Sequence, residues 1–385
     1  MKVSQICVGR FHHFDLARQL SKRGLLERIF TGYPSWKIKD EGIPVDQLTS
    51  YPWVMAPYMG LVRWGKYRNI WQKDLSWLAH ESLDRHVARH LPPSDWLIAL
   101  SGSGLRSGGV AKSRGMHVVC DRGSSHIRFQ NQILTDEYKI YGEQFTGVDP
   151  RMLHKEEAEY DRADFITVPS EFARRSFIEM GVPAEKVCKI PYGVDLRRFS
   201  KVGDPPESSF EVLFVGQISP RKGIKYLLEA FGRLKHPRKR LTIVGGTVPE
   251  ALRYLQRNPP GEQVRFLGHQ PQAQLKEIMS RSHAMVLPSI EEGLALVQAQ
   301  AMACGCPVVA TWNTGASDLF DDGRSGFIVQ PRDVASIVDR LQQLADDDVL
   351  RRRMSESALA HISSLGGWDQ YGDRFDELLQ SRRAS

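Results

Sequence analysis

The chain is poor in cysteine and has no long hydrophobic run. Its 385 residues include five cysteines, which are too few and too scattered for a disulfide framework. Cys304 and Cys306 have no second cysteine pair at the spacing of a metal site. No apolar stretch reaches the length of a membrane span, and Arg10 with two histidines interrupts the first twenty residues, unlike a signal peptide. We therefore expect a protein of the reducing cytoplasm, either soluble or bound peripherally at the inner face of a membrane.

The sequence also lacks low-complexity segments, short internal repeats and a strong charge of either sign. The formal net charge of +7 lies mainly in the first half of the chain. An excess of this size suits an anionic substrate or an acidic membrane surface, and it also suits solubility alone. Because the basic residues are dispersed and no nucleic-acid-binding module is recognisable, we expect no nucleic-acid partner.

Apolar segments bounded by turn residues alternate with helical patterns, which is typical of parallel sheets covered by helices. A polar linker at 195–210, with paired prolines, separates two such series. This predicts an α/β protein with two doubly wound, Rossmann-like domains at 1–197 and 198–361, followed by an amphipathic helix within 362–385. The expected strands include VSQICV, WLIALS, HVVCDR, DFITVPS, VCKIPYG, FEVLFVGQ, RLTIVGG, VRFLGH, AMVLPSI, CPVVAT and SGFIVQP.

Residues 213–231, LFVGQISPRKGIKYLLEAF, predict a buried strand, a tight turn and a helix. The turn carries Gly216 and the neighbouring cations Arg221 and Lys222. Such a turn lies at the carboxyl edge of a parallel sheet, where α/β proteins bind ligands. A diphosphate is the natural partner of two cations there, and a basic surface turn is the simpler alternative.

Residues 290–309, IEEGLALVQAQAMACGCPVV, predict a loop that runs into a helix from about Leu296 to Gly305. The first amides of that helix lack intrahelical partners and would form an anion site behind Gly293. Glu292 and Gln300 are eight positions apart, which is about 12 Å along a helix. A carboxylate and an amide at that distance could bind hydroxyls at the two ends of a ligand that has a diphosphate between them.

In their order along the chain, these motifs resemble the retaining glycosyltransferase family 4. The resemblance covers about residues 155–375, and the first 150 residues fit more loosely. It implies the GT-B fold, in which two Rossmann-like domains face a cleft and the C-terminal helix crosses back to the first domain. The resemblance is carried by ADFITVPSEFARRSFIEMGVPAEKVCKIPYGVDLRRF, VGQISPRKG, PSIEEGLALVQAQAMACGCPVVAT, DDGRSGFIVQP and GWDQYGDRF.

The resemblance also implies roles for individual residues. Glu292 would contact hydroxyls of the donor sugar, Lys222 would neutralise the diphosphate, and Gln300 would hold the ribose. Backbone groups would bind the distal phosphate and, near Leu267, the base. The implied donor-binding positions are Gly216, Gln217, Leu267, Gly293, Leu294, Ala295, Leu296, Val297 and Gln300.

Three of these positions depart from the family. Gln300 stands where the family usually has glutamate, Gln217 where it usually has arginine, and Ala295 where it usually has a second glycine. Arg221 lies in the same turn and could replace the cation missing at 217. Gln300 can still bond a ribose hydroxyl, although a neutral acceptor makes the weaker bond; it could also serve only a polar contact of the helix.

Two loops of the first domain are expected to face the cleft. VGRFHHF, residues 8–14, follows the first strand, and its counterpart in the family lies near the acceptor and the distal phosphate. In DRGSSH, an arginine or a histidine could take the place of the histidine that many relatives direct at the donor sugar. A helix entry with incidental histidines is the alternative for the first loop. The candidate acceptor-side residues are Gly9, Arg10, His12, His13, Arg122 and His126.

A glycine-containing segment of the first domain imitates a dinucleotide-binding fingerprint. Gly102 and Gly104 follow an expected strand, and Asp121 closes the next one. Ser107 occupies the third glycine position, and the unit is not the first of its kind in the chain. We expect no nicotinamide site here.

Residues 51–80 interleave tryptophans with basic residues, among them Arg63, Lys66, Arg68 and Lys73. This pattern at helical spacing suits an interfacial helix on anionic lipid headgroups. It equally suits an aromatic platform for a sugar acceptor or an ordinary helix packed on its own domain. All three interpretations stay open.

Together these features predict a retaining glycosyltransferase that moves a sugar from a nucleotide diphosphate sugar to an acceptor hydroxyl. The acceptor would be a sugar, a lipid-linked or a small molecule in glycan, glycolipid or polysaccharide synthesis. The predicted catalytic residues are Glu292, Lys222 and Arg221, which act by electrostatic stabilisation of the leaving diphosphate, since no pair of cleft carboxylates suggests double displacement. We expect no metal and no other cofactor, because the Asp-x-Asp at 346–348 falls among surface helices.

Two other functions fit parts of the sequence. A GT-B protein that binds nucleotide sugars without turnover, in a regulatory role, would explain the three departures from the family. An epimerase or phosphorylase of the same fold would act without a separate acceptor or would need free phosphate.

Overall fold

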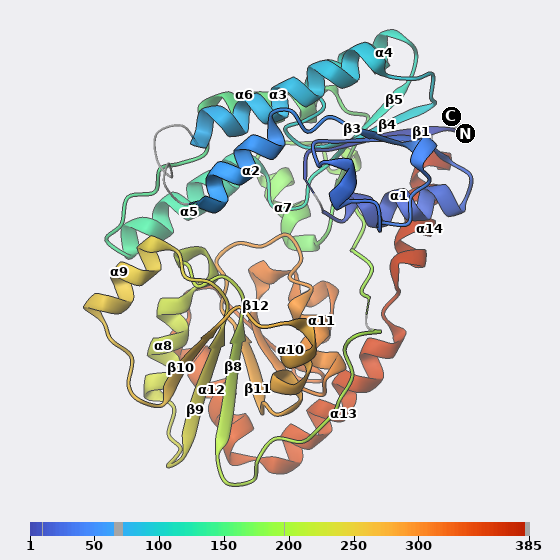
Figure 1. The fold of residues 1–385 in the computed structure, drawn as a ribbon. Helices are drawn as coiled ribbons and strands as arrows, with labels where there is room; N and C mark the ends of the chain where they lie inside the picture. Colours follow the sequence, from blue (N-terminus) through green and yellow to red (C-terminus); the bar gives the residue numbers. More distant parts are fainter. Residues whose placement is uncertain (10, 65–71, 196, 382–385) are drawn as a thin grey trace.

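The computed structural model describes residues 1–9, 11–64, 72–195 and 197–381. Two parallel sheets lie one above the other in Figure 1, each with helices on both faces. The first has seven strands in the order β3-β2-β1-β4-β5-β6-β7. Its strands are β1 Val3–Cys7, β2 Leu26–Thr31, β3 Leu48–Ser50, β4 Trp96–Leu100, β5 His117–Asp121, β6 Phe165–Val168 and β7 Val187–Lys189.

The second sheet has six strands in the order β10-β9-β8-β11-β12-β13. All six were expected from the sequence, whereas β2 and β3 of the first sheet were not among the expected strands. The strands are β8 Phe210–Val215, β9 Lys239–Val244, β10 Val264–Gly268, β11 Ala284–Leu287, β12 Val308–Thr311 and β13 Gly326–Val329.

Helices connect the strands of both sheets. Those of the first are α1 His13–Lys22, α2 Met55–Trp64, α3 Gln72–His90, α4 Leu105–Ser113, α5 Ile127–Ile140, α6 Pro150–Arg162 and α7 Glu171–Glu179. Those of the second are α8 Ile224–Arg233, α9 Pro249–Arg257, α10 Gln272–Ser280, α11 Val297–Ala303, α12 Val334–Asp346 and α13 Asp348–Ser364. The last helix is α14, Trp368–Ser381.

Burial explains why the central strands are so apolar. Every residue of β8, FEVLFV, is buried, because helices cover both faces of a parallel sheet. The edge strand β10 is partly exposed and carries Arg265. Helix α8 turns Ile224, Leu227, Ala230 and Phe231 toward the sheet at helical spacing.

The strand order places the ligand-binding edge of each domain. In the first sheet β1 lies between β2 and β4, and in the second β8 lies between β9 and β11, so the direction of chain winding reverses next to β1 and β8. Loops after strands at such a reversal form the binding crevice of open α/β sheets. The loops after β1, β8 and β11 are therefore the ones that should build a site.

The C-terminal helix returns to the first domain, which confirms that expectation. Helix α14 packs along α1 (Figure 1), and Tyr371, Phe375 and Leu379 are buried in the same hydrophobic cluster as Phe14 and Leu16. Helix α13 packs instead against α11 of the second domain. The end of the chain thus ties the two domains together.

No helix in the described part of the chain combines the length and the apolar character needed to cross a membrane.

Candidate active site between the two sheets

A cavity of about 500 Å³ lies between the domains, within the range of small-molecule sites. Both domains and the C-terminal helix contribute to its wall. It is lined by Phe11, His12, Asp15, Tyr192, Val215, Gly216, Lys222, Glu292, Leu294, Ala295, Leu296, Val297 and Trp368.

The turn after β8 brings Lys222 to this cavity. Pro220–Lys222 form one turn of 3-10 helix, which ends at Gly223 with φ of +69°. A Cβ atom on Gly223 would lie 2.0 Å from the carbonyl oxygen of Pro288, so only glycine allows the turn to approach the loop after β11 this closely. Lys222 forms an ion pair with the carboxylate of Glu292, so the turn after β8 and the loop after β11 meet at this cavity.

Arg221, the other cation of the turn, is directed at carboxylates. Its Nε donates to the carbonyl oxygen of Glu291 at 2.9 Å and lies 3.0 Å from Glu291 Oε2. Its Nη2 lies 3.6 Å from Glu292 Oε2. The guanidinium is therefore already paired, and Lys222 is the cation of this turn that lines the cavity.

Glu291, which the sequence reasoning missed, joins the two domains next to the site. Its side chain is fully buried and accepts hydrogen bonds from Ser124 Oγ at 2.5 Å, Ser125 Oγ at 2.7 Å and Gln130 Nε2 at 3.0 Å. Burial alone would raise the pKa of Glu291, but Arg221 and these hydrogen bonds lower it to about 2. A second-domain carboxylate thus holds the first-domain loop after β5, and the doubled glutamate before Gly293 was the only sequence signal for it.

The domains also meet at the backbone of Gly293. A Cβ atom there would lie 1.9 Å from the carbonyl oxygen of Gly123, so the small residue permits a close contact between the domains. Ser170 Oγ donates to the carbonyl oxygen of Gly293 at 2.6 Å. Gly293 serves this contact and does not line the cavity.

The entry to α11 has the expected form, with Leu296 as N-cap and Gly305 just past the end. Of the amides expected to bind phosphate, that of Ala295 donates to the carbonyl oxygen of Thr314 at 3.0 Å and is occupied. The amides of Leu296 and Val297 make no hydrogen bond within the described residues, and both residues line the cavity.

Two glutamines of α11 have different surroundings. Gln298 is buried and bonds the carbonyl oxygens of Ala295 and Thr314, both at 3.1 Å. Gln300 is half-buried and does not line the cavity as the structure stands.

The remaining donor-side residues also lie off the cavity wall. Gln217 is exposed beside Gly216. The carbonyl oxygen of Leu267 accepts from Gln270 Nε2 at 2.6 Å, so it already has a partner.

In the first domain, His12 is the expected acceptor-side residue that lines the cavity. Its Nε2 lies 2.8 Å from Asp121 Oδ2, and its ring lies 4.3 Å from that of Tyr192, centroid to centroid. His13 is fully buried, and its Nε2 lies 3.1 Å from the same oxygen. Gly9 is buried beside these residues, and Arg10 lies outside the described residues.

Arg122 and His126 do not line the cavity. Arg122 pairs with Glu156 at 2.9 Å and donates to Gln130 Oε1 at 2.9 Å. His126 is buried at the start of α5, where its Nδ1 accepts from the amide of Arg128 at 3.2 Å. Both side chains stabilise the loop that Glu291 binds.

The glycine-containing loop after β4 is occupied by a carboxylate of its own domain. Glu159 Oε2 accepts from the amide of Gly102 at 2.5 Å and Oε1 from that of Gly104 at 2.8 Å. The amides that would hold a dinucleotide phosphate are therefore used internally. Burial raises the pKa of Glu159 to about 8.

The sequence of the second domain matches a known family. Residues 197–361 match the family described as "Glycosyl transferases group 1". The second domain is similar to this family along almost its whole length.

Curated proteins similar to this chain include D-inositol 3-phosphate glycosyltransferase of Corynebacterium jeikeium, 30% identical over 57% of this chain and 58% of the relative. The protein of the same name from Streptomyces avermitilis is 33% identical over 48% of this chain and 44% of the relative. The chain thus spans about half the length of these relatives.

Solved structures of low sequence identity share the whole fold. Sucrose-phosphate synthase from Thermosynechococcus elongatus superposes with a TM-score of 0.71 at 19% identity, over 100% of this chain and 99% of that chain. HepE of Anabaena in complex with UDP and glucose superposes with a TM-score of 0.69 at 18% identity, over 99% of this chain and 100% of that one. The chain has the GT-B fold, as the sequence predicted.

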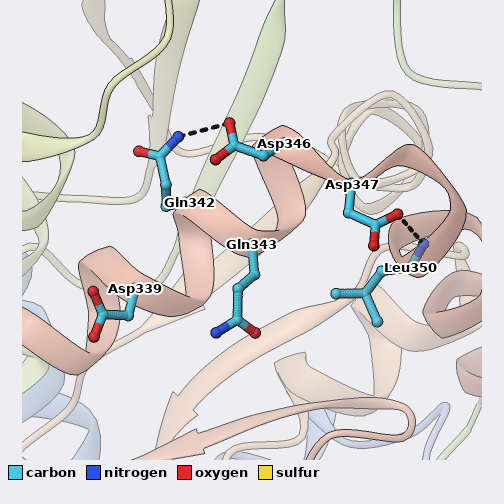
Figure 2. A pocket seen from close by; sticks show the side chains of 6 residues that line it. All are labelled: Asp339, Gln342, Gln343, Asp346, Asp347 and Leu350. Atoms are coloured by element: carbon cyan, nitrogen blue, oxygen red, sulfur yellow. Dashed lines mark hydrogen bonds between the residues drawn. The ribbon is translucent and has the colours of Figure 1, made fainter.

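The Asp-x-Asp of the second domain lies where α12 meets α13. Figure 2 shows the shallow acidic hollow there, in which Gln342 Nε2 donates to Asp346 Oδ1 at 2.8 Å and Asp347 Oδ1 accepts from the amide of Leu350 at 2.8 Å. These aspartates satisfy polar groups of the two helices and do not line the interdomain cavity.

Within the segment 51–80, the described residues are mostly packed on the first domain. Tyr51, Tyr58 and Met59 pack against its core, and Trp77 lies under Arg151 at 5.3 Å and Lys155 at 5.6 Å. Trp53 is 76% exposed. The expected basic residues Lys66 and Arg68 lie outside the described residues, as does the side chain of Arg63, while Lys73 donates to a backbone carbonyl.

Proposed function

We propose that this protein is a retaining, metal-independent glycosyltransferase that transfers a sugar from a nucleotide diphosphate sugar to an acceptor hydroxyl. The observation that carries the proposal is the meeting of Lys222 and Glu292 in the interdomain cavity, beside the unbonded amides of Leu296 and Val297. The similarity of the second domain to glycosyl transferases supports a glycosyl-transfer role for this arrangement.

Lys222 and Glu292 have complementary tasks in this proposal. The ammonium group of Lys222 is within reach of a diphosphate in the cavity, where it would stabilise the negative charge that develops as the sugar leaves. The carboxylate of Glu292 accepts hydrogen bonds from sugar hydroxyls. Without a ligand the two charges neutralise each other, so donor binding must exchange their ion pair for contacts to phosphate and sugar.

Arg221 has an indirect role in this proposal. Its guanidinium is paired with Glu291 and lies near Glu292. It therefore orients these two carboxylates and does not bind the diphosphate directly. We assign it to positioning of Glu292 and keep Lys222 as the diphosphate ligand.

Asp15 is a second carboxylate on the cavity wall, which the sequence reasoning did not anticipate. It is ion-paired with Arg18 of α1. Burial raises the pKa of Asp15 despite that pair. Asp15 belongs to the acceptor side of the cavity, and the proposed retention of configuration does not use it as a nucleophile.

The relatives suggest which donors and acceptors to test. One relative, from Corynebacterium glutamicum, is named a GDP-mannose-dependent mannosyltransferase of a phosphatidylinositol monomannoside, and HepE was solved with UDP-glucose. We propose a sugar, lipid-linked or small polyhydroxyl acceptor, in keeping with glycan or glycolipid synthesis in the cytoplasm. Contact of residues 51–80 with a membrane stays a prediction.

A donor screen followed by a product assay tests the proposal. UDP-glucose, GDP-mannose and their free nucleotides are screened by thermal shift, because a ligand of the native state raises Tm. Nucleotide release and the anomeric configuration of the product are then measured with myo-inositol, D-inositol 3-phosphate and methyl glycosides. Transfer with retention supports the proposal, and full activity after EDTA treatment supports metal independence. Tight nucleotide binding without any product would instead favour the regulatory alternative.

A further inference from the structure

A buried carboxylate that the donor chemistry does not use lies against His12, which lines the cavity on the first-domain side. Asp121 ends β5, and its Oδ1 accepts from Thr167 Oγ1 at 2.7 Å while its Oδ2 faces His12 Nε2 at 2.8 Å. Burial would raise the pKa of Asp121, but His12, His13 and Thr167 hold it below its usual value. The side chain is therefore ionised at neutral pH and can only accept hydrogen bonds.

An ionised Asp121 decides which nitrogen of His12 carries the proton. Since Oδ2 requires a donor, Nε2 is protonated, and in the neutral imidazole Nδ1 is then an acceptor. His12 lines the cavity, and in the part of the chain that the structure describes no hydrogen bond to Nδ1 is found. The ring of Tyr192, at 4.3 Å, holds the imidazole from one side.

We propose that Asp121 is a positioning residue that fixes the tautomer of His12, so that Nδ1 accepts a hydrogen bond from the hydroxyl of the acceptor substrate. This role rests on the proposed glycosyl transfer and adds to it the group that orients the acceptor. It requires a hydrogen-bond donor on the acceptor at this point of the cavity. A hydroxyl held through its hydrogen keeps an oxygen lone pair directed away from His12.

A divalent metal ion is the competing occupant of this cluster. His12, His13 and Asp121 bring one ligand atom each within 4.8 Å of one another. His13 is fully buried, and burial lowers its pKa to about 3. Its Nε2 lies 3.1 Å from Asp121 Oδ2, but neither ring nitrogen makes a hydrogen bond to any of the described residues. Metal-binding histidines usually donate their second nitrogen to a partner, and the buried Nδ1 of His13 has none. Tautomer control of His12 therefore fits these contacts better.

The decisive variant is Asp121→Asn, which keeps the size of the side chain and reverses the hydrogen bond. An amide group can donate to Nε2, which places the imidazole proton on Nδ1 and turns that nitrogen from an acceptor into a donor. We expect kcat/KM for the acceptor to fall about 10- to 100-fold, the range for leaving a polar group mispaired. Donor Kd and the slow release of sugar to water should stay unchanged.

His12→Ala should lose a similar factor, and the double variant should lose little more, because both changes remove one interaction. His117→Gln is the matched control, since His117 begins the strand that Asp121 ends. Should Asp121→Asn fail to fold, His12→Ala carries the same prediction. The measurements use the donor, UDP-glucose or GDP-mannose, that raises Tm of the wild-type protein, with myo-inositol and methyl glycosides as acceptors.

Unchanged acceptor kinetics in Asp121→Asn, or an equal loss of donor affinity, would overturn this role. One equivalent of bound divalent metal that Asp121→Asn releases, together with inactivation by EDTA, would overturn it in favour of a metal site. A wild-type protein that binds neither donor and releases no nucleotide would overturn the proposed function itself, and that outcome is visible before any variant is made.

Discussion

Two strand-loop-helix units of this protein have glycine-containing loops at equivalent places in their sheets but use the backbone amides of those loops differently. The loop after β4, residues 101–104, and the loop after β11, residues 288–296, both contain glycine at the carboxyl edge of a parallel sheet. In the first, Glu159 of α6 accepts from the amides of Gly102 and Gly104. In the second, the amides of Leu296 and Val297 make no hydrogen bond to the described part of the chain and lie beside the cavity.

The difference shows that a glycine loop becomes an anion site only when nothing inside the protein occupies its amides. Glu159 is 57 positions from Gly102, so the loop sequence itself contains no sign of it. The loop after β11 is instead kept open by the contacts of its acidic residues, with Glu291 directed at the first domain and Glu292 at Lys222.

The largest effect should come from removing the charged side chains beside the loop after β11, which we call the open loop because two amides at its end lie beside the cavity. We expect Lys222→Ala and Glu292→Ala each to lower kcat about 10²- to 10³-fold, the usual loss for a group that stabilises developing charge. The fold should be intact by circular dichroism, since both side chains face the cavity. Full activity in Glu292→Ala would refute the assignment of this loop to the donor.

Gly293→Ala tests how closely the open loop must approach the first domain. The new methyl group would meet the carbonyl oxygen of Gly123, so we expect a loss of about 1–3 kcal/mol in the free energy of unfolding, as for other overpacked sites. Weaker donor binding and a larger radius of gyration in solution scattering should accompany it. Gly232→Ala is the control, because that helical glycine has open space around it and alanine should stabilise α8 slightly.

Glu159→Gln tests whether the loop after β4, the closed loop whose amides bind Glu159, is purely structural. One of the amides of Gly102 and Gly104 would then face an NH2 group, which cannot accept a hydrogen bond, whereas both oxygens of a carboxyl group keep a lone pair even when it is protonated. We therefore expect a loss of about 1–3 kcal/mol in unfolding free energy with nucleotide-sugar affinity unchanged. Glu157→Gln on the same helix, where the partner is a surface arginine, should cost less. A loss of donor binding in Glu159→Gln alone would show that the closed loop takes part in the site.

The pH dependence of stability gives Glu159 a second signature. Its folded pKa of about 8 lies above the usual value for glutamate, so the native state binds a proton that the unfolded state has released between about pH 4.5 and 8. Its contribution to stability is therefore present at low pH and is lost as the pH rises through 8. Chemical denaturation at several pH values should show this fall in the wild-type protein and its absence in Glu159→Gln.

The smallest effect is expected at Gln300. This half-buried residue stands where the family usually has a ribose-binding glutamate, so Gln300→Glu should preserve nucleotide affinity or tighten it up to about tenfold, as a charged acceptor bonds hydroxyls more strongly. Titration calorimetry with the nucleotide measures this directly. A large loss of affinity would mean that the chain binds its ribose elsewhere.

The strands and site residues of the second domain could be predicted from the sequence more completely than those of the first, and the reason is physical. Its six strands are apolar runs between turn residues, and its site depends on neighbours along the chain: Gly223 beside Lys222, and Glu292 just ahead of α11. In the first domain, β2 has the charged residues Glu27 and Arg28 among four buried ones, and β3 is only three residues long, so neither sequence has the apolar period of a buried strand.

By itself the sequence determined the alternation of strands and helices, the turn that carries Lys222, and the position of Glu292 before a helix, because each of these depends on local backbone preferences and periodicity. Only the tertiary structure decided which polar groups form hydrogen bonds and ion pairs with one another. Glu159 closes one loop, Glu291 holds the two domains together with Arg221, and Asp121 orients His12. Those pairings join residues 55 to 166 positions apart, and only the packing of the two sheets brings them within hydrogen-bonding distance.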